Sequence, residues 1–235
     1  MTDIHNHLLY GIDDGSKSIE ESIDVLKDMK KCGYDNIILT PHYIKDSKWN
    51  NPRKDNLERM EILQKALNDN NIDINLYLGN EIFIDEDIYE LLMREEMSSL
   101  NGTNYLLIEL PMNGEYEDYK DIFKDLIRKG YHVILAHPER YHSFQKDFNK
   151  VYELEKIGVY FQSNLDSIIG GYGDSAEKTV KRLLKEKKVA FLATDIHHKK
   201  HDYTKWQRAK LVALKYLSEK EFDILTDKNP SQLLG

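Results

Sequence analysis

Cysteine is nearly absent from the sequence: Cys32 is the single one among 235 residues, so no disulfide can form within the chain. The sequence also lacks a run of about 20 apolar residues, the length that a membrane-spanning helix needs. It does not begin with the basic segment and apolar core of a cleavable signal peptide. We therefore expect a cytoplasmic protein that does not insert into a membrane.

Basic residues are also fewer than acidic ones: the sequence has 33 Lys and Arg residues, 41 Asp and Glu residues and a net charge of −8. Proteins that bind nucleic acids present a basic surface, so nucleic acid is not an expected partner. Three signatures of nucleophiles or phosphate loops are missing as well: Cys-x5-Arg, G-x-S-x-G and GxxxxGKS/T. The residue six positions after Cys32 is Ile38, which excludes the chemistry of the cysteine-dependent phosphatases.

What is present is an alternation of short apolar runs and amphipathic stretches. Seven apolar runs are typical of buried strands, at 3–8, 36–40, 74–78, 105–110, 132–136, 159–162 and 189–194. The other stretches have helical spacing, at 20–31, 57–68, 87–97, 119–129, 151–157, 176–187, 204–217 and 219–226. Strands that alternate with helices predict an α/β fold with parallel strands. We expect one domain over residues 1–235.

Histidines and carboxylates lie at or just after the ends of six of these strands. They are His5 and His7 with Asp13 and Asp14, then His42, Glu81, Glu109, His137 with Glu139, and finally Asp195 with His197. The carboxyl ends of parallel strands meet at one edge, where the connecting loops converge. A closed barrel would bring all these side chains together, whereas an open sheet would keep the outer ones apart. The pattern therefore favours a barrel.

This mixture of imidazoles and carboxylates predicts a site for Zn, Mn, Fe or a similar divalent ion. His5 and His7 occupy alternate positions of a strand, so both rings point to the same side. Asp195 and His197 repeat that spacing. One such pair is weak evidence, and an isolated acidic residue is more often a loop or helix-cap carboxylate. It is the combination at one edge of the fold that predicts a metal site.

Glu109 is a more specific indication, because a glutamate inside the apolar run 105–110 is costly to bury unless it is paired or bound to a metal. Spacing alone allows either Asp13 or Asp14 as a ligand. His132 begins its strand at the opposite end and has no expected role in the site. The roles of three further histidines stay open: His142, His198 and His201.

The chain resembles the polymerase-and-histidinol-phosphatase (PHP) superfamily in the motifs HNHLLYGIDDG, TPH, GNE, HPERY and the late D-x-H. Within it, IDDG, HPERY and the closing NPSQLLG resemble the bacterial protein-tyrosine phosphatases that accompany capsule and exopolysaccharide tyrosine kinases. The motifs occur in order over essentially the whole chain. The resemblance implies a distorted (β/α)7 barrel of the TIM-like PHP type, with a metal site at the C-terminal ends of the strands.

The resemblance also implies three divalent metal ions, with manganese expected first and Fe, Zn or Mg as alternatives. The ligands that it implies are His5, His7, Asp14, His42, Glu81, Glu109, His137, Asp195 and His197. One ion would be held by His5, His7, Glu81 and Asp195, a second by Glu81, Glu109 and His137, and a third by Asp14, His42 and His197. The choice of Asp14 over Asp13 comes from the resemblance.

The expected reaction is hydrolysis of a phosphate monoester by a metal-bound hydroxide that attacks phosphorus without a phospho-enzyme. His42 and Arg140 are the expected catalytic residues, and Arg140 would grip the phosphate through its planar guanidinium. An ordinary surface arginine is the alternative for Arg140. The resemblance suggests a second arginine after D-x-H, but the sequence there is HKKHDYTKW. Its place in substrate binding would fall to Lys199, Lys200 or His201.

The expected partner is a phosphotyrosine protein, namely a bacterial tyrosine kinase that regulates capsule or exopolysaccharide synthesis. A histidinol-phosphate phosphatase, or another PHP enzyme for small phosphomonoesters, is the nearest alternative. A DNA-processing PHP domain is disfavoured by the acidic net charge. A catalytically inactive metal-binding partner of a kinase is disfavoured by the full ligand set with Arg140. A comparison of phosphotyrosine peptide with histidinol phosphate separates the first two.

Overall fold

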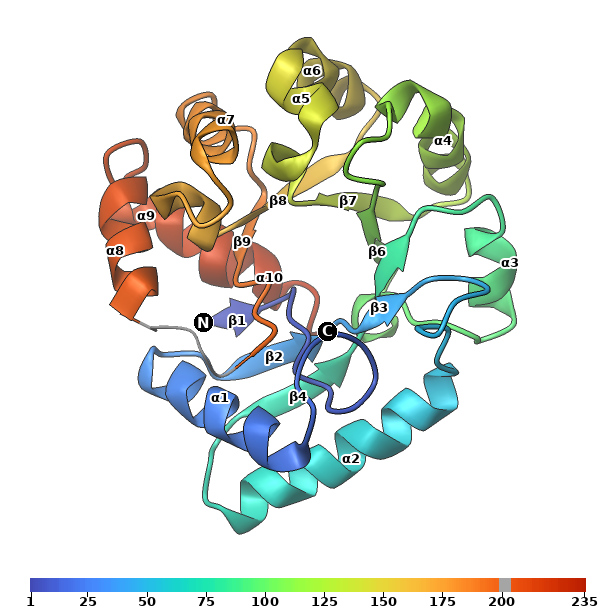
Figure 1. Cartoon of the computed structure of the whole chain (residues 1–235), viewed down its shortest axis with the longest axis vertical. Helices are drawn as coiled ribbons and strands as arrows, with labels where there is room; N and C mark the ends of the chain where they lie inside the picture. The colour runs from blue at the N-terminus through green and yellow to red at the C-terminus, as the bar shows by residue number, and fades with distance from the viewer. Residues whose placement is uncertain (199–203) are drawn as a thin grey trace.

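The computed structural model describes residues 1–198 and 204–235, in which short parallel strands are surrounded by helices (Figure 1). The strands are β1 (Thr2–Asp3), β2 (Asn36–Leu39), β3 (His42–Tyr43), β4 (Asn75–Leu78), β5 (Glu81–Phe83), β6 (Tyr105–Glu109), β7 (His132–Ala136), β8 (Tyr160–Asn164) and β9 (Phe191–Ala193). Every pair is parallel, and the pairs form one sheet in the order β1-β2-β4 and another in the order β3-β5-β6-β7-β8-β9. The α/β fold with parallel strands is confirmed.

The helices follow the strands along the chain. They are α1 (Ile19–Lys31), α2 (Arg53–Asp69), α3 (Ile88–Met93), α4 (Lys120–Arg128), α5 (His142–Lys146), α6 (Asn149–Lys156), α7 (Asp174–Lys185), α8 (Thr204–Ala213), α9 (Glu219–Asp223) and α10 (Asn229–Ser231). Short turns of 3-10 helix are η1 (Leu100–Gly102), η2 (Tyr116–Tyr119), η3 (Pro138–Arg140) and η4 (Asp166–Ile169), and η5 (Ile224–Lys228) is a π-helical turn. Within the described residues, no helix combines the length and apolar character needed to cross a bilayer.

The two sheets are joined through β2 and β3, and again through β4 and β5. Pro41, which has no N–H to donate, lies between β2 and β3, and its carbonyl accepts the N–H of Glu81 at 3.2 Å. Gly79 follows β4, and its N–H donates to the Leu39 carbonyl at 2.8 Å. A Cβ atom at Gly79 would lie 2.7 Å from Leu100 Cδ2, so this close approach requires glycine. The breaks between β2 and β3 and between β4 and β5 place His42 and Glu81 in the second sheet.

The beginning and the end of the sheet order also lie side by side. The N–H of Asp195 donates to the His5 carbonyl at 2.8 Å, and the N–H of His7 donates to the Ile196 carbonyl at 2.8 Å. Asp3, which is fully buried, accepts both the N–H and the hydroxyl of Thr194 at 2.9 Å. Residues 191 positions apart in the sequence are therefore tied together next to β1 and β9.

Two hydrophobic clusters lie on opposite sides of the strands. The larger one fills the space between strands and helices and includes Leu106, Ile108, Val133 and Leu135. The smaller one contains the alternate residues of the same strands together with other strand and C-terminal residues: Ile4, Ile38, Leu100, Leu107, Ile134, Ala136, Phe191, Ala193 and Leu233. Because successive side chains of a strand point to opposite faces, one face packs on the helices and the other surrounds this inner cluster.

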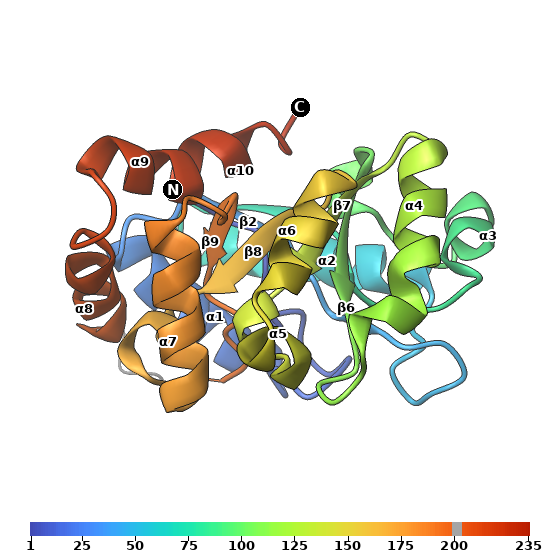
Figure 2. The same cartoon turned by 90° about the horizontal axis from the view of Figure 1, so that it is seen from above.

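The C-terminal segment covers one end of the strands, as Figure 2 shows for α9 and α10. Leu233 belongs to the inner cluster, and its carbonyl accepts the side-chain N–H of Asn101 at 3.0 Å. Asn229 donates to the carbonyl of Ala190, just before β9, at 2.8 Å. Both contacts lie near the amino-terminal ends of their strands, so the opposite end remains for the site.

Each of the seven predicted runs overlaps a strand in the described structure, but several bounds differ. The strand expected over 3–8 is limited to β1, because residues 5–7 bond to the segment after β9 instead. The helix expected from 57 begins at Arg53, because its polar first turn lacks the apolar spacing on which the prediction relied. The helix expected over 87–97 ends at Met93, and Glu95 there has a left-handed backbone with φ 58°.

We expect Leu107→Ala to lower the free energy of unfolding by about 2–5 kcal/mol, the usual effect of a cavity left by a deleted core side chain. Leu107 lies in β6 and is completely buried in the inner cluster. Leu211→Ala, at a side chain that is 67% exposed, is the control and should change stability by at most about 0.5 kcal/mol. Urea denaturation measures both, and equal effects would contradict the inner cluster as a packed core.

Candidate metal centre

The side chains proposed from the sequence as ligands meet at the carboxyl ends of the strands. His5 and His7 follow β1, Asp14 lies in the loop before α1, His42 and Glu81 begin β3 and β5, Glu109 ends β6, His137 follows β7, and Asp195 and His197 follow β9. Four overlapping groups of their donor atoms each fall within 4.8 Å: His7, Asp14, His42 and His197; His5, His7 and Glu81; His5, His137 and Asp195; His42, Glu81 and Glu109.

Glu81 lies at the middle of this cluster. Its Oε1 is 2.9 Å from His137 Nε2 and 3.2 Å from His5 Nε2. Its Oε2 is 3.1 Å from His42 Nδ1 and 3.2 Å from His7 Nε2. Burial raises the pKa of the Glu81 carboxyl, but the nearby His5 and His42 rings outweigh it and hold that pKa well below its usual value. Glu81 therefore faces four imidazoles as a carboxylate.

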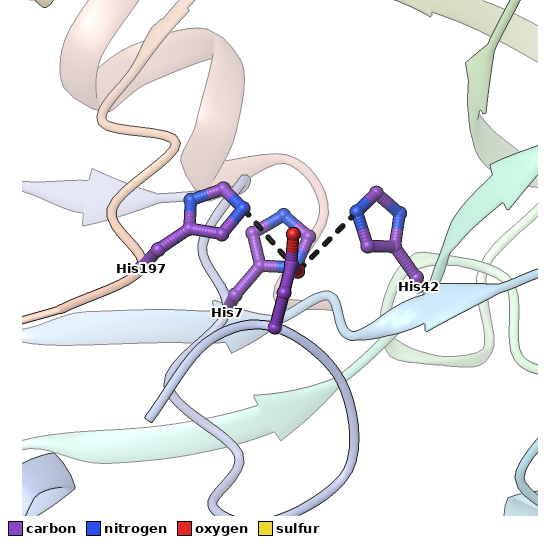
Figure 3. Close-up of side chains that lie close together, drawn as sticks. His7, His42 and His197 are labelled. Carbon is purple, nitrogen blue, oxygen red and sulfur yellow. Dashed lines mark ion pairs between the residues drawn. The ribbon is translucent and has the colours of Figure 1, made fainter. Parts of the chain in front are cut away.

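A second part of the cluster brings Asp14 together with His7, His42 and His197, and Figure 3 shows these three histidines close together. Asp14 Oδ1 is 3.7 Å from His42 Nε2 and 3.6 Å from His197 Nε2. The rings of His7 and His197 stack with 3.9 Å between centroids. Since Asp14 is half-exposed whereas Glu81 is buried, this part of the cluster is the one nearer to solvent.

Glu109 and Asp195 complete the cluster. Glu109 Oε1 is 3.7 Å from His137 Nε2, and its Oε2 is 3.8 Å from His42 Nδ1. Asp195 Oδ1 is 3.4 Å from His5 Nε2 and 3.7 Å from His197 Nδ1. The backbone of Asp195 is left-handed, with φ 52°, so Asp195 and His197 share the spacing of His5 and His7 but do not form an extended strand.

The pKa values of the cluster reflect burial first and nearby like charges second. Burial and the charge of Glu81 raise the pKa of the Glu109 carboxyl to about 9. Burial and the cation of Arg140 lower the pKa of His137 to about 4. Burial and the neighbouring His7 ring lower the pKa of His197 to about 4. Carboxylates held this close repel one another, and a bound cation would remove that repulsion.

Several buried atoms of the cluster have no hydrogen-bond partner among the described residues. They are Nε2 of His5, Nε2 of His7, Nδ1 of His42 and Oδ1 of Asp14. A buried polar atom without a partner costs about 1–3 kcal/mol, so native structures rarely keep several in one place. Each of these atoms lies within 4 Å of another donor of the cluster. The residues present therefore fit divalent cations held by nitrogen and oxygen ligands.

Residues behind the cluster fix the orientation of its histidines. Asp13 Oδ2 is 2.7 Å from His7 Nδ1 and also accepts the N–H of His42 at 3.0 Å. Gln162 Oε1 is 2.8 Å from His5 Nδ1. Such contacts to one ring nitrogen direct the other toward a metal. Of the two adjacent aspartates, Asp14 thus points into the cluster and Asp13 supports it from behind.

Arg140 lies at the edge of the cluster with its side chain 25% exposed. Its Nη1 donates to Asp195 Oδ2 at 3.0 Å, and its guanidinium lies over the ring of Tyr172. Arg140 is thus partly buried and paired with a proposed metal ligand. The other residues expected to bind the substrate, Lys199, Lys200 and His201, lie outside the described residues.

Sequence reasoning missed several of these contacts. Gln162 and Asn164 are buried polar residues of β8, a strand with no predicted ligand, and the polar run QSN in a buried strand was the available signal. Trp49, in the loop between β3 and α2, stacks on His42 with 5.0 Å between centroids and 12° between planes. No sequence pattern pointed to Trp49. Outside the cluster, His132 contacts the Tyr105 ring, in agreement with its exclusion.

Comparison with known proteins shows similarity over the whole chain. The family model described as "Capsular polysaccharide synthesis, CpsB/CapC" matches residues 1–235. The putative tyrosine-protein phosphatase CapC of Staphylococcus aureus is 33% identical over 201 residues, which are 84% of this chain and 77% of that protein. The tyrosine-protein phosphatase YwqE of Bacillus subtilis is 32% identical over 222 residues, 94% of this chain and 85% of that protein.

Solved structures show the same similarity. A chain from the crystal structures of YwqE from Bacillus subtilis and CpsB from Streptococcus pneumoniae, described as unique metal-dependent tyrosine phosphatases, has a TM-score of 0.89 and 31% identity, over 100% of this chain and 94% of that one. Histidinol phosphate phosphatase from Lactococcus lactis has a TM-score of 0.62 and 15% identity, over 92% of this chain and 93% of that one. The second similarity shows a shared fold alone.

We expect Gly15→Ala to reduce metal binding, because a Cβ at Gly15 would lie 1.9 Å from the His7 carbonyl oxygen and 2.5 Å from His7 Cβ. The loop that carries Asp13 and Asp14 must then move away from His7. Loss of such support typically weakens metal affinity about 10- to 100-fold. Metal analysis after dialysis against a range of free Mn²⁺ concentrations measures the change.

Gly130→Ala is the matched control for this experiment. Gly130 follows α4 with φ +92°, and a Cβ there meets nothing within 4 Å. This variant should lose about 1 kcal/mol of stability through backbone strain and bind metal as the unchanged protein does. Normal metal affinity in Gly15→Ala would contradict the role given to the loop.

Proposed function

This chain belongs to the CpsB/CapC family of capsular polysaccharide synthesis proteins, and on that premise we propose that it is a metal-dependent protein-tyrosine phosphatase. The proposed substrate is phosphotyrosine on a protein, namely a bacterial tyrosine kinase that regulates capsule or exopolysaccharide synthesis. The observation that carries this proposal is the buried cluster of imidazoles and carboxylates with Arg140 at its open edge. We propose a cytoplasmic location, in keeping with the single cysteine.

We also propose that residues 1–235 form one domain, a closed and distorted (β/α)7 barrel. Counting β2 with β3 and β4 with β5 as continuous strands turns the nine strands of the described residues into seven. The backbone hydrogen bonds of His5 and His7 with the segment 195–196 support closure. The inner cluster supports it as well, because its side chains come from β2, β6, β7 and β9 alike. These features are typical of a packed barrel interior.

Three divalent ions are proposed, with manganese first and Fe, Zn or Mg as alternatives. His5, His7, Glu81 and Asp195 would hold one, Glu81, Glu109 and His137 a second, and Asp14, His42 and His197 a third. The central place of Glu81, whose two oxygens face different histidines, supports its sharing between ions. The exposed side of Asp14 supports a third ion that is within reach of substrate.

Divalent ions, when bound, lower the pKa of water and neutralise phosphoryl oxygens. The chain itself supplies orientation: Asp13 and Gln162 fix the rings of His7 and His5. Arg140 presents a planar cation that matches two oxygens of a phosphate. We propose direct transfer of the phosphoryl group to water, in keeping with the lack of a Ser or Cys nucleophile motif in the sequence.

The decisive test compares two substrates with the Mn²⁺-loaded protein. We expect kcat/KM to be at least about tenfold higher for a phosphotyrosine peptide than for histidinol phosphate, a difference of about 1.4 kcal/mol in transition-state binding. Phosphate release measures both, and a chelator with confirmed metal loss should abolish both. Faster turnover of histidinol phosphate would overturn the tyrosine assignment and favour a small-molecule phosphatase. Absence of turnover with either ester would favour an inactive metal-binding partner of a kinase.

We expect Arg140→Ala to lower kcat/KM for the phosphotyrosine peptide about 10²- to 10³-fold, as loss of one strong donor to the transition state does. Metal content in excess Mn²⁺ should stay unchanged, because the side-chain N–H of Asn164 still donates to Asp195 Oδ2 at 2.6 Å. Arg128→Ala is the matched control, since that side chain is 76% exposed and pairs with Asp125 on α4. Full activity of Arg140→Ala would contradict the proposed phosphate grip.

A further inference from the structure

We propose that Tyr172 is a positioning residue that holds the guanidinium of Arg140 in the plane needed to bind the phosphoryl group. This inference rests on the proposed function, because it gives Arg140 the role of phosphate ligand. Tyr172 belongs to the sequence GGYG, which lies outside the motifs that carry the proposed ligands. Its contacts connect a surface turn to Arg140 and to a proposed metal ligand.

The turn that carries Tyr172 is shaped by glycines. Gly170 and Gly173 have φ of +82° and +89°, conformations that other residues rarely adopt. A Cβ at Gly171 would lie 2.9 Å from the Asp166 carbonyl oxygen, and the N–H of Gly171 donates to that same carbonyl at 2.9 Å. The turn between η4 and α7 is thus held closely against Asp166, and Tyr172 projects from it.

Tyr172 contacts Arg140 through its ring and Asp195 through its hydroxyl. The guanidinium carbon of Arg140 lies 4.5 Å from the centre of the Tyr172 ring, which is within the range of a cation–π interaction. The hydroxyl donates to Asp195 Oδ2 at 3.2 Å. Arg140 Nη1 donates to that same oxygen at 3.0 Å. The three side chains therefore form a closed set of contacts, in which the ring supports the guanidinium and both share one carboxylate oxygen.

Asp195 alone does not fix the plane of the guanidinium. In the described part of the chain, the hydrogen bond of Arg140 is made through Nη1 to one oxygen, and a single bond allows rotation around it. Stacking on the Tyr172 ring restricts that rotation. An arginine has five N–H donors, so the edge not used by Asp195 stays available for a phosphate.

Arg140 and Tyr172 also line an open cavity of about 390 Å³, and Arg140 itself contacts Asp195 of the cluster. The cavity walls further include Met112, His142 and Gln145. The guanidinium is thus reached from solvent on one side and supported by Tyr172 on another. The cavity therefore gives a ligand access to the solvent side of Arg140.

The test uses Tyr172→Leu, which removes the ring, and Tyr172→Phe, which keeps the ring and removes the hydroxyl. We expect Tyr172→Leu to raise the inhibition constant of inorganic phosphate and the KM for phenyl phosphate and the phosphotyrosine peptide. Each should rise about 2- to 30-fold, the range expected for a lost cation–π contact. Tyr172→Phe should stay within about threefold of the unchanged protein. Both variants should keep their metal content and their kcat should change less than KM.

A double-mutant cycle distinguishes positioning from general structural support. Phosphate binding to the Mn²⁺-loaded proteins is measured by calorimetry, so that low activity of Arg140→Ala does not prevent the comparison. In the Arg140→Ala background, Tyr172→Leu should change phosphate affinity less than about twofold, because the contact is already lost. An effect as large as in the unchanged protein would overturn the proposal, and so would loss of bound metal or an equal defect in Tyr172→Phe.

Tyr152→Leu is the matched control, since Tyr152 is 36% exposed and Tyr172 is 37% exposed. The ammonium of Lys188 also lies over the Tyr152 ring, 5.4 Å from its centroid. The Tyr152 hydroxyl contacts Glu186. This variant should bind phosphate normally. Phosphate binding does not depend on which ester is hydrolysed. If the phosphotyrosine assay fails while the variants show the expected phosphate affinities, the proposed function is overturned and the role of Tyr172 is supported.

Discussion

The structure depends on holding Glu81, Glu109 and Asp195 together in a buried volume where their charges repel one another. The pKa of Glu109 rises to about 9 through burial and through the charge of Glu81, which shows the cost of this arrangement in the protein alone. The imidazoles around Glu81 offset part of that cost. Divalent cations would offset the remainder. The fold therefore maintains a site in which the buried carboxylates are unfavourable unless divalent cations are bound.

The cluster stays in place because several of its members have one end fixed to the scaffold. His5 and His7 each use Nδ1 for Gln162 and Asp13, and direct Nε2 toward the centre. Asp195 follows the same rule, because Asn164 and Arg140 donate to its Oδ2 while its Oδ1 faces the histidines. Fixing one atom of each side chain sets the direction of the other. The positions of the donor atoms at the centre are therefore set by residues that contribute no donor atom of their own.

The sequence predicted the parallel α/β fold and the meeting of His5 with Asp195, because strand periodicity places their loops at one edge. It could not separate Asp13 from Asp14, since one position of shift in a loop leaves no periodic signal. The two differ in their tertiary contacts, because Asp13 bonds to the His7 ring and the N–H of His42, whereas Asp14 faces the rings of His42 and His197. Gln162 escaped prediction for a similar reason: it meets His5 across 157 positions of sequence, and local patterns carry no information about such pairs.

In the proposed function, phosphate binding depends on the guanidinium of Arg140. The resemblance to the PHP phosphatases suggests a second arginine after D-x-H, where this sequence has Lys199, Lys200 and His201. A lysine is a compact charge with rotating donors, whereas an arginine binds two oxygens in one plane. Where a single planar cation must orient the phosphoryl group, rotation of that cation lowers affinity directly. Stacking on Tyr172 restricts this rotation, so the turn GGYG supports the guanidinium on which the proposed phosphate binding depends.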